Sequence, residues 1–252
     1  MHGLELVESV IERLSDEGLS YLNHYEPAVP VGEAVLHELR FPNGAPLSPA
    51  LRRWLGYDAG LLGFFDDPAK PVFRARSISE FAEDVYGDGE VAKKFGALAK
   101  TLPGLCFGLP MGKDAKRFLY VGEGPLDSVG EHPVLVLDPA DPPFVCVEYP
   151  GIDVFLADKA RFFLRRSREF GGFGFDEVYG PRMQEHRDRL FDGRPSIKYG
   201  EDGFAPMIET DLEADETMLL APHQPLPDGY RVVEEISNPM FGGVMRLVAP
   251  IR

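Results

Sequence analysis

The residue types that can do chemistry are all present in this chain, but their spacing matches no familiar catalytic or metal-binding pattern. The six histidines are scattered, at His2, His24, His37, His132, His186 and His223. None has a second ligand at the spacing of a known metal motif, so a metal site would have to be assembled from distant residues. Neither Cys106 nor Cys146 stands in a nucleophile motif, and there is no Gly-x-Ser-x-Gly elbow. We therefore predict no catalytic residue, no metal and no cofactor.

Two glycine-rich stretches resemble nucleotide-binding loops, but both lack the required context. In Gly108–Asp114 the glycines are one residue too close together, and Asp114 stands where a phosphate loop has a magnesium-binding Ser or Thr. The stretch Gly171–Gly174 follows a predicted helix, whereas a dinucleotide site follows a strand. We interpret the first stretch as a turn and the second as a helix end with a flexible link.

Carboxylates are abundant, and adjacent acidic pairs are more often solvated than catalytic. The pairs are Asp66-Asp67, Glu83-Asp84 and Asp215-Glu216. Such pairs act as acid and base only where burial separates their pKa values. Turns and polar helix faces, where these pairs are predicted, leave them in water.

An arginine-containing segment interrupts the acidic chain. Arg182, Arg187, Arg189 and Arg194 alternate with Glu185, Asp188 and Asp192. The favoured interpretation is a surface helix with ion pairs along it. The functional alternative is a contact with an anion or a partner.

The composition indicates a folded protein with a strongly acidic surface. The chain has 252 residues, a formal charge of −15 and 44% hydrophobic residues. This charge repels nucleic acid and anionic membranes and attracts a basic partner, although solubility alone also explains it. The two cysteines are predicted to be buried free thiols. Neither a signal peptide nor a membrane-spanning run is recognisable, so we expect a cytoplasmic protein.

The centre of the chain predicts the core of the fold. Residues 117–121, 134–137 and 144–148 read as strands, separated by Pro, Gly and Asp. An apolar helix is predicted to follow from Ile152, with Phe155, Leu156, Phe162 and Phe163 on one face. The arginines at its end complement the helix dipole.

The segments before this core predict four helices. They span residues 4–14, 47–56 with Ser48 as cap, 79–86 with a capping box between Ser77 and Glu80, and 90–100. Residues 34–41 and 72–76 are predicted as short strands and residues 103–112 as a loop.

The C-terminal part predicts three further strands, at 218–221, 230–236 and 244–249, the last two as a hairpin. A Gly-rich link and a change of charge pattern suggest a boundary near residue 170, between residues 1–170 and a C-terminal extension, 171–252. We expect an α+β fold with a central mixed or antiparallel sheet flanked by helices.

Several of these segments resemble the SUKH superfamily. The stretch Leu47–Leu55 is similar to the short Leu-Pro-led helix near the start of such domains, and Gly63-Phe64-Phe65 stands at their Gly-aromatic turn. The central strands and the helix from Ile152 match their sheet and closing helix. The resemblance covers roughly residues 30–165 and departs at Ser48-Pro49, where the proline is shifted by one position.

The resemblance implies a binding protein without catalytic residues. Many bacterial members are immunity proteins that neutralise a toxin, often a nuclease, from a neighbouring cell. We therefore expect a cytoplasmic protein that blocks a basic toxin domain. The predicted contact residues lie in one turn-rich span: Asp66, Asp67, Glu83, Asp84, Asp88 and Glu90. The alternatives are a regulatory or scaffold protein of the same fold and a hydrolase that uses carboxylates.

Overall fold

The computed structural model describes ten segments of the chain. They comprise residues 1–17, 28–109, 116–122, 126–160, 162, 173–200, 203–206, 218–220, 230–238 and 243–250. The chain forms two compact units, Met1–Pro206 and Met207–Arg252. The predicted helix-terminal arginines, residues 110–114 of the first glycine-rich stretch and residues 171–172 of the second lie outside the described residues.

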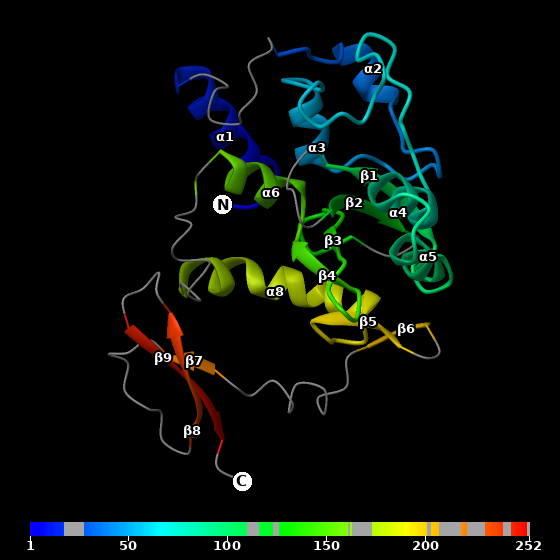
Figure 1. Ribbon diagram of the computed structural model, residues 1–252. Coiled ribbons are helices and arrows are strands. Elements are labelled where there is room, and N and C mark those ends of the chain that lie inside the picture. Colours follow the sequence, from blue (N-terminus) through cyan, green and yellow to red (C-terminus); the bar gives the residue numbers. More distant parts are fainter. Residues whose placement is uncertain are drawn as a thin grey trace. The chain divides into compact units, whose positions relative to one another are not determined.

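A six-stranded antiparallel sheet forms the centre of the first unit (Figure 1). Its strands are β1 (Gly104–Gly108), β2 (Lys116–Gly122), β3 (Val134–Asp138), β4 (Phe144–Tyr149), β5 (Ser196–Gly200) and β6 (Gly203–Pro206). They lie side by side in chain order. Strand β3 is buried from Val134 to Leu137, as its unbroken apolar run predicts. The three predicted central strands are confirmed.

Three helices pack together beside the sheet and bury most of the N-terminal core. They are α1 (Gly3–Glu17), α3 (Pro49–Leu55) and α6 (Ile152–Lys159). The Ser48 hydroxyl caps α3 by accepting a hydrogen bond from the Leu51 N–H, and Trp54 is fully buried. Helix α6 ends earlier than expected, at Lys159, and a carbonyl of its last turn accepts a hydrogen bond from the Phe162 N–H.

Two further helices lie near β1 (Figure 1). Helix α4 (Ile78–Tyr86) begins with the predicted capping box, in which Ser77 and Glu80 exchange hydrogen bonds. Helix α5 (Glu90–Gly96) continues as a 3-10 turn over Ala97–Lys100. Phe81 of α4 packs its ring against Phe118 of β2, with 4.9 Å between the ring centroids.

Two local predictions are wrong. Residues 34–41 contain the helix α2 (Glu33–Glu38) instead of a strand, because Leu36 is its one buried residue and the short apolar pattern fits either structure. Part of the predicted loop 103–112 is the strand β1, which pairs with β2 over its whole length. Pro103 precedes this strand, Gly104 and Gly108 are its first and last residues, and residues 110–112 lie outside the described part of the chain. Residues 72–76 form only isolated bridges, at Phe73 and Arg76.

Helix α8 (Phe173–Leu190) and strands β5 and β6 belong to the first unit. Strand β5 pairs with β4, and α8 packs against β4. Residues 173–206 therefore complete the sheet. The second unit contains a separate three-stranded sheet of β7 (Met218–Leu220), β8 (Tyr230–Asn238) and β9 (Gly243–Pro250). The antiparallel pairing of β8 with β9 confirms the predicted hairpin. The helices and the antiparallel sheets together give the α+β fold that the sequence predicts.

Gly104 of β1 pairs with Gly122 of β2, and the Tyr120 side chain lies close to both glycines. A Cβ atom on Gly104 would lie 2.6 Å from the Tyr120 ring. We expect Gly104→Ala to lower the free energy of unfolding by about 1–3 kcal/mol in urea denaturation, because the buried ring has to shift. The control is Gly96→Ala, whose Cβ would meet nothing closer than 3.7 Å and should leave stability unchanged or raise it. Equal effects of the two variants would contradict this account.

Candidate functional site

The most concentrated group of charges in the first unit is buried around Arg182 of α8. Its Nε donates to Asp127 over 2.6 Å, and its two terminal nitrogens donate to the Asp153 carboxylate over 2.8 and 3.2 Å. All three side chains are at least 95% buried. The Gly3 N–H donates to the same Asp153 carboxylate over 2.7 Å. We call Arg182, Asp127 and Asp153 the buried triad.

Local backbone structure positions the two aspartates. Asp127 closes a turn, because its second carboxylate oxygen accepts hydrogen bonds from the N–H groups of Val129 and Glu131 over 3.0 and 2.8 Å. Asp153 lies in the first turn of α6, where a carboxylate is favourable. A Cβ on Gly151 would lie 2.6 Å from both the Asp153 carboxylate and the Glu131 side chain. Glycine at 151 therefore lets the two acidic side chains approach.

One face of α8 fastens the turn that carries Asp127. Besides Arg182, Glu185 accepts hydrogen bonds from the N–H and hydroxyl of Ser128, over 2.7 and 2.8 Å. Arg189 donates to the Leu126 carbonyl over 2.6 Å. Positions 182, 185 and 189 share one helix face. This face therefore makes three polar contacts with the turn that contains Asp127.

The triad is accompanied by a third buried acid, Glu131. Its carboxylate accepts a hydrogen bond from the Ser48 hydroxyl over 2.8 Å. Burial raises the pKa of Glu131 well above its usual value near 4.5, and the charge of Asp153 adds to this. The environment therefore favours the neutral, protonated acid.

Asp127 is held in the opposite state. Burial raises the pKa of Asp127, but hydrogen bonding and the Arg182 charge outweigh it and lower this pKa to about 2. His186 contributes, with its Nε2 atom 3.7 Å from the carboxylate. Because this pKa lies below the usual 3.8, the stabilisation is present above that pH and is lost as the pH falls toward about 2.

Three histidines surround these acids. The His186 ring forms a hydrogen bond with the Pro150 carbonyl over 2.9 Å. Burial, together with the neighbouring His186, lowers the pKa of His132 to about 4, so this ring is neutral. Burial and Arg182 lower the pKa of His2, whose ring packs edge-on against Tyr179.

The chemistry open to this cluster is limited by its own contacts. Acid–base catalysis requires a carboxyl group that reaches a substrate. Here Asp127 and Asp153 face a guanidinium, and Glu131 faces Ser48. What the group does physically is connect the N-terminus, α3, the 126–131 turn, α6 and α8. We interpret it as a structural centre.

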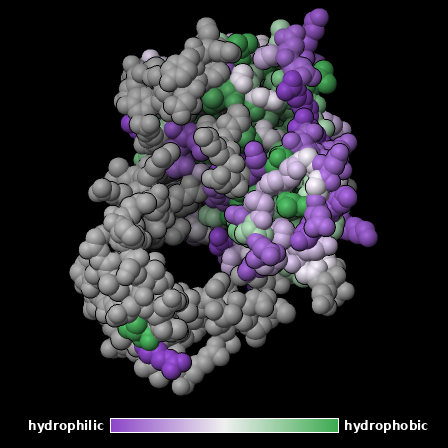
Figure 2. All heavy atoms as spheres, in the orientation of Figure 1, coloured by the Kyte–Doolittle hydropathy of each residue, from purple (hydrophilic) through white to green (hydrophobic). Residues whose placement is uncertain are grey.

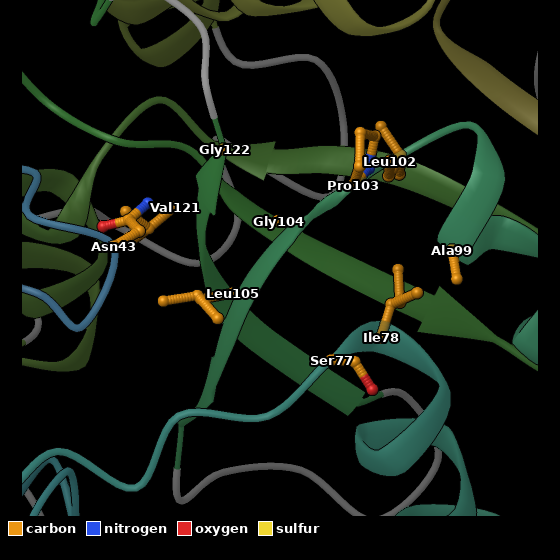
Figure 3. A pocket seen from close by; sticks show the side chains of 10 residues that line it. All are labelled: Asn43, Ser77, Ile78, Ala99, Leu102, Pro103, Gly104, Leu105, Val121 and Gly122. Atoms are coloured by element: carbon orange, nitrogen blue, oxygen red, sulfur yellow. The ribbon is translucent and has the colours of Figure 1, made fainter.

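Clefts also occur in the first unit. The one in Figure 3 has a volume of about 320 Å³. Its apolar lining includes Ile78, Leu102, Leu105 and Val121. Its two polar side chains serve local structure, because Ser77 caps α4 and Asn43 accepts a hydrogen bond from the Ala45 N–H. The cleft therefore offers a hydrophobic surface to a ligand.

The second cleft is small, about 60 Å³, and lies between β2 and α8. His132, His186 and Arg189 line it together with Tyr120. The His132 Nε2 atom is buried without a hydrogen-bond partner. A neutral imidazole nitrogen of this kind accepts a hydrogen bond, and the space suits ordered water.

The six predicted contact residues are all exposed, but their surroundings differ. Arg74 pairs with Asp66 and lowers the pKa of that carboxyl through a hydrogen bond. Arg76 pairs with Asp84 over 2.7 Å. Asp67 accepts a hydrogen bond from the Ala69 N–H. Since Arg74 and Arg76 lie two residues apart, one short segment neutralises two of the six carboxylates.

The remaining three, Glu83, Asp88 and Glu90, lie within eight residues where α4 ends and α5 begins. Within the described residues they form no ion pair. The last turn of α4 contains no basic residue, so Glu83 and Asp84 stand at the negative end of the helix dipole. Hydrophilic residues dominate this side of the molecule (Figure 2). We call Glu83, Asp88 and Glu90 the acidic corner.

The sequence interpretation missed the buried triad. It assigned Arg182 to a surface helix, whereas the side chain is 3% exposed. One signal was available. The residues at helical spacing on one side of α8 are Tyr179, Arg182, Met183 and His186, and all are buried. An arginine within an apolar stripe indicates a buried carboxylate partner.

Comparisons with protein-family models, curated proteins and solved structures found no match. The resemblance to the SUKH superfamily thus stays a prediction from the residues quoted above. Within the described segments, no group of three His, Cys, Asp or Glu side chains is arranged to hold a metal ion. No helix in that part of the chain is both long and apolar enough to cross a membrane.

Removal of the central guanidinium should be severe. We expect Arg182→Met to lower the free energy of unfolding by about 3–5 kcal/mol, because two buried carboxylates lose their partner. The measurement is urea denaturation near neutral pH. The exposed Arg53, whose Nε is 3.9 Å from Glu8, provides the control Arg53→Met, with an expected loss below about 1 kcal/mol. A loss from Arg182→Met no larger than the control's would refute the structural role.

The protonation of Glu131 predicts a pH dependence of stability. A raised pKa means that the folded state binds more protons than the unfolded state, so stability falls as the pH rises from about 4.5 toward the folded-state value. Glu131→Gln keeps the hydrogen-bond acceptor for Ser48 and removes this titration. Urea denaturation from about pH 4.5 to about pH 9 should show the free energy of unfolding of Glu131→Gln rising relative to that of the wild type as the pH rises. The control Glu90→Gln should show the same pH dependence as the wild type. A constant difference for Glu131→Gln would exclude a neutral Glu131.

Proposed function

We propose that this chain is an immunity-type binding protein, located in the cytoplasm, that neutralises a basic toxin domain such as a nuclease by covering its active site. The observation that carries the proposal is the acidic corner. It places three exposed carboxylates within eight residues, none with an ion-pair partner among the described residues. Glu83 stands in the last turn of α4, where a carboxylate opposes the helix dipole, so helix stability does not account for it.

The total charge supports the same function. At a formal charge of −15, the protein attracts basic surfaces and repels nucleic acid. A nuclease needs a basic cleft to hold its substrate. An acidic protein that enters such a cleft associates rapidly, and its rate falls as salt screens the attraction.

The buried charges support a scaffold over a hydrolase. Convergent, buried Asp and Glu residues would favour the hydrolase if they faced a substrate cavity. Asp127 and Asp153 instead bind Arg182. Their contacts stabilise the fold and leave recognition to the surface. A regulatory scaffold for another partner fits the same contacts, and the identity of the bound protein separates the two.

The test uses the toxin domain encoded beside this gene, since immunity genes lie next to toxin genes. We expect the wild-type chain to copurify with that domain and to protect cells that express it. A variant with Glu83, Asp88 and Glu90 changed to Lys should associate at least about tenfold more slowly at low salt and show a weaker salt dependence.

The matched control reverses three exposed carboxylates elsewhere, Asp141, Asp188 and Asp192, and so has the same net charge. If both triple variants slow association equally, total charge and not the acidic corner sets the rate. If the wild-type chain neither binds nor protects, the immunity function is wrong.

A further inference from the structure

A groove lies between α1, α2 and α3, and none of its lining residues belongs to the acidic corner. It combines exposed apolar surface with acidic residues at its rim. Its volume is about 650 Å³. The floor consists of the buried side chains Val31, Leu36 and Leu47. At its rim, Leu4 of α1 is 42% exposed. Hydrophobic surface is visible where α2 and α3 lie in Figure 1 (Figure 2).

The apolar character of this groove is open to a partner. The exposed Leu4 lies beside this hydrophobic floor, and such a combination is typical of interaction surfaces. Gly56 at the end of α3 keeps the groove open, because a Cβ there would already lie 3.1 Å from the Leu36 side chain.

The rim also carries two arginines, each of which contacts a group of the protein itself; only Arg53 faces a carboxylate. Arg52 donates a hydrogen bond to the Leu36 carbonyl. Arg53 lies 3.9 Å from Glu8 across the rim. Glu33 lines the same rim and has no ion-pair partner among the described residues.

The helices that form the groove are acidic. Together α1, α2 and α3 contain seven carboxylates and three arginines. Among these carboxylates, Glu5, Glu12 and Glu38 are exposed. The field around the groove therefore favours a cation, whereas its floor favours aliphatic side chains.

We infer that this groove is a docking site for a basic amphipathic helix of the protein partner. Apolar residues of that helix, at helical spacing, would cover Leu4 and the floor, and its Lys or Arg residues would face Glu33 and its acidic neighbours. The inference rests on the proposed binding function and adds a second contact surface to the acidic corner. Charge at the corner directs the encounter, whereas the groove buries apolar area and slows dissociation.

The first test uses a fluorescein-labelled peptide of leucine and lysine, with the leucines at i, i+3, i+4 and i+7, and measures anisotropy with the full chain. We expect saturable binding that falls when glutamate replaces lysine or when the leucine spacing is scrambled. Gly56→Leu should weaken binding about tenfold without changing the charge, because it fills the groove. Glu33→Lys should weaken it as well, and most at low salt.

The matched charge control is Asp188→Lys, at an exposed position of α8, which should leave peptide affinity unchanged. Circular dichroism and urea denaturation verify that each variant is folded, and Gly56→Ala replaces Gly56→Leu if the latter unfolds. Equal binding to wild type and Gly56→Leu would mean that the peptide binds by charge alone, which overturns the inference. A dimer that is disrupted by Gly56→Leu would also overturn it, because the occupant would be a second copy.

A second readout separates this inference from the proposed function. If wild type and Gly56→Leu protect cells from the neighbouring toxin equally well, the groove inference fails and the immunity function stands. If the wild type protects no cell, the function fails, whatever the peptide result. Loss of protection in Gly56→Leu, with retained folding, supports both.

Discussion

The fold depends on one guanidinium that binds two buried carboxylates from distant parts of the chain. Arg182 joins α8 to the 126–131 turn through Asp127 and to α6 through Asp153. Asp153 in turn accepts the N–H of Gly3, which fixes the start of α1. Burying any one of these charges without its partner would cost a large desolvation free energy, so the elements that carry them are stable only when they are assembled together.

This constraint explains why the protonation states differ within a few ångströms. Arg182 bears one positive charge and binds two aspartates directly. The third acid, Glu131, is hydrogen-bonded to Ser48 and lies close enough to Asp153 to feel its charge. A third negative charge would have no cation to balance it, and the protonated form avoids this. With Glu131 neutral, the cluster carries one excess negative charge instead of two, and the contacts of its acids all serve the fold.

The sequence predicted the elements whose signals are local. Ser48 with Pro49, and Ser77 with Glu80, mark helix starts that the structure confirms. The short segments at α2 and β1 were misassigned because a few apolar residues between Pro and Gly fit several structures. The apolar stripe of α8 marks Arg182 as buried, but its partners could not be predicted, because they lie 55 and 29 residues away and come together only in the assembled fold.

Stability and recognition are therefore divided between different charges of the same chain. The carboxylates that stabilise are buried and paired, and a change in them would be expressed as unfolding. Glu83, in contrast, stands in the last turn of α4, which contains no basic residue. There it opposes the helix dipole, and the scaffold tolerates it because the triad and the apolar core supply its stability. Such residues can vary without disturbing the fold, which is the property that a surface needs in order to follow a changing partner.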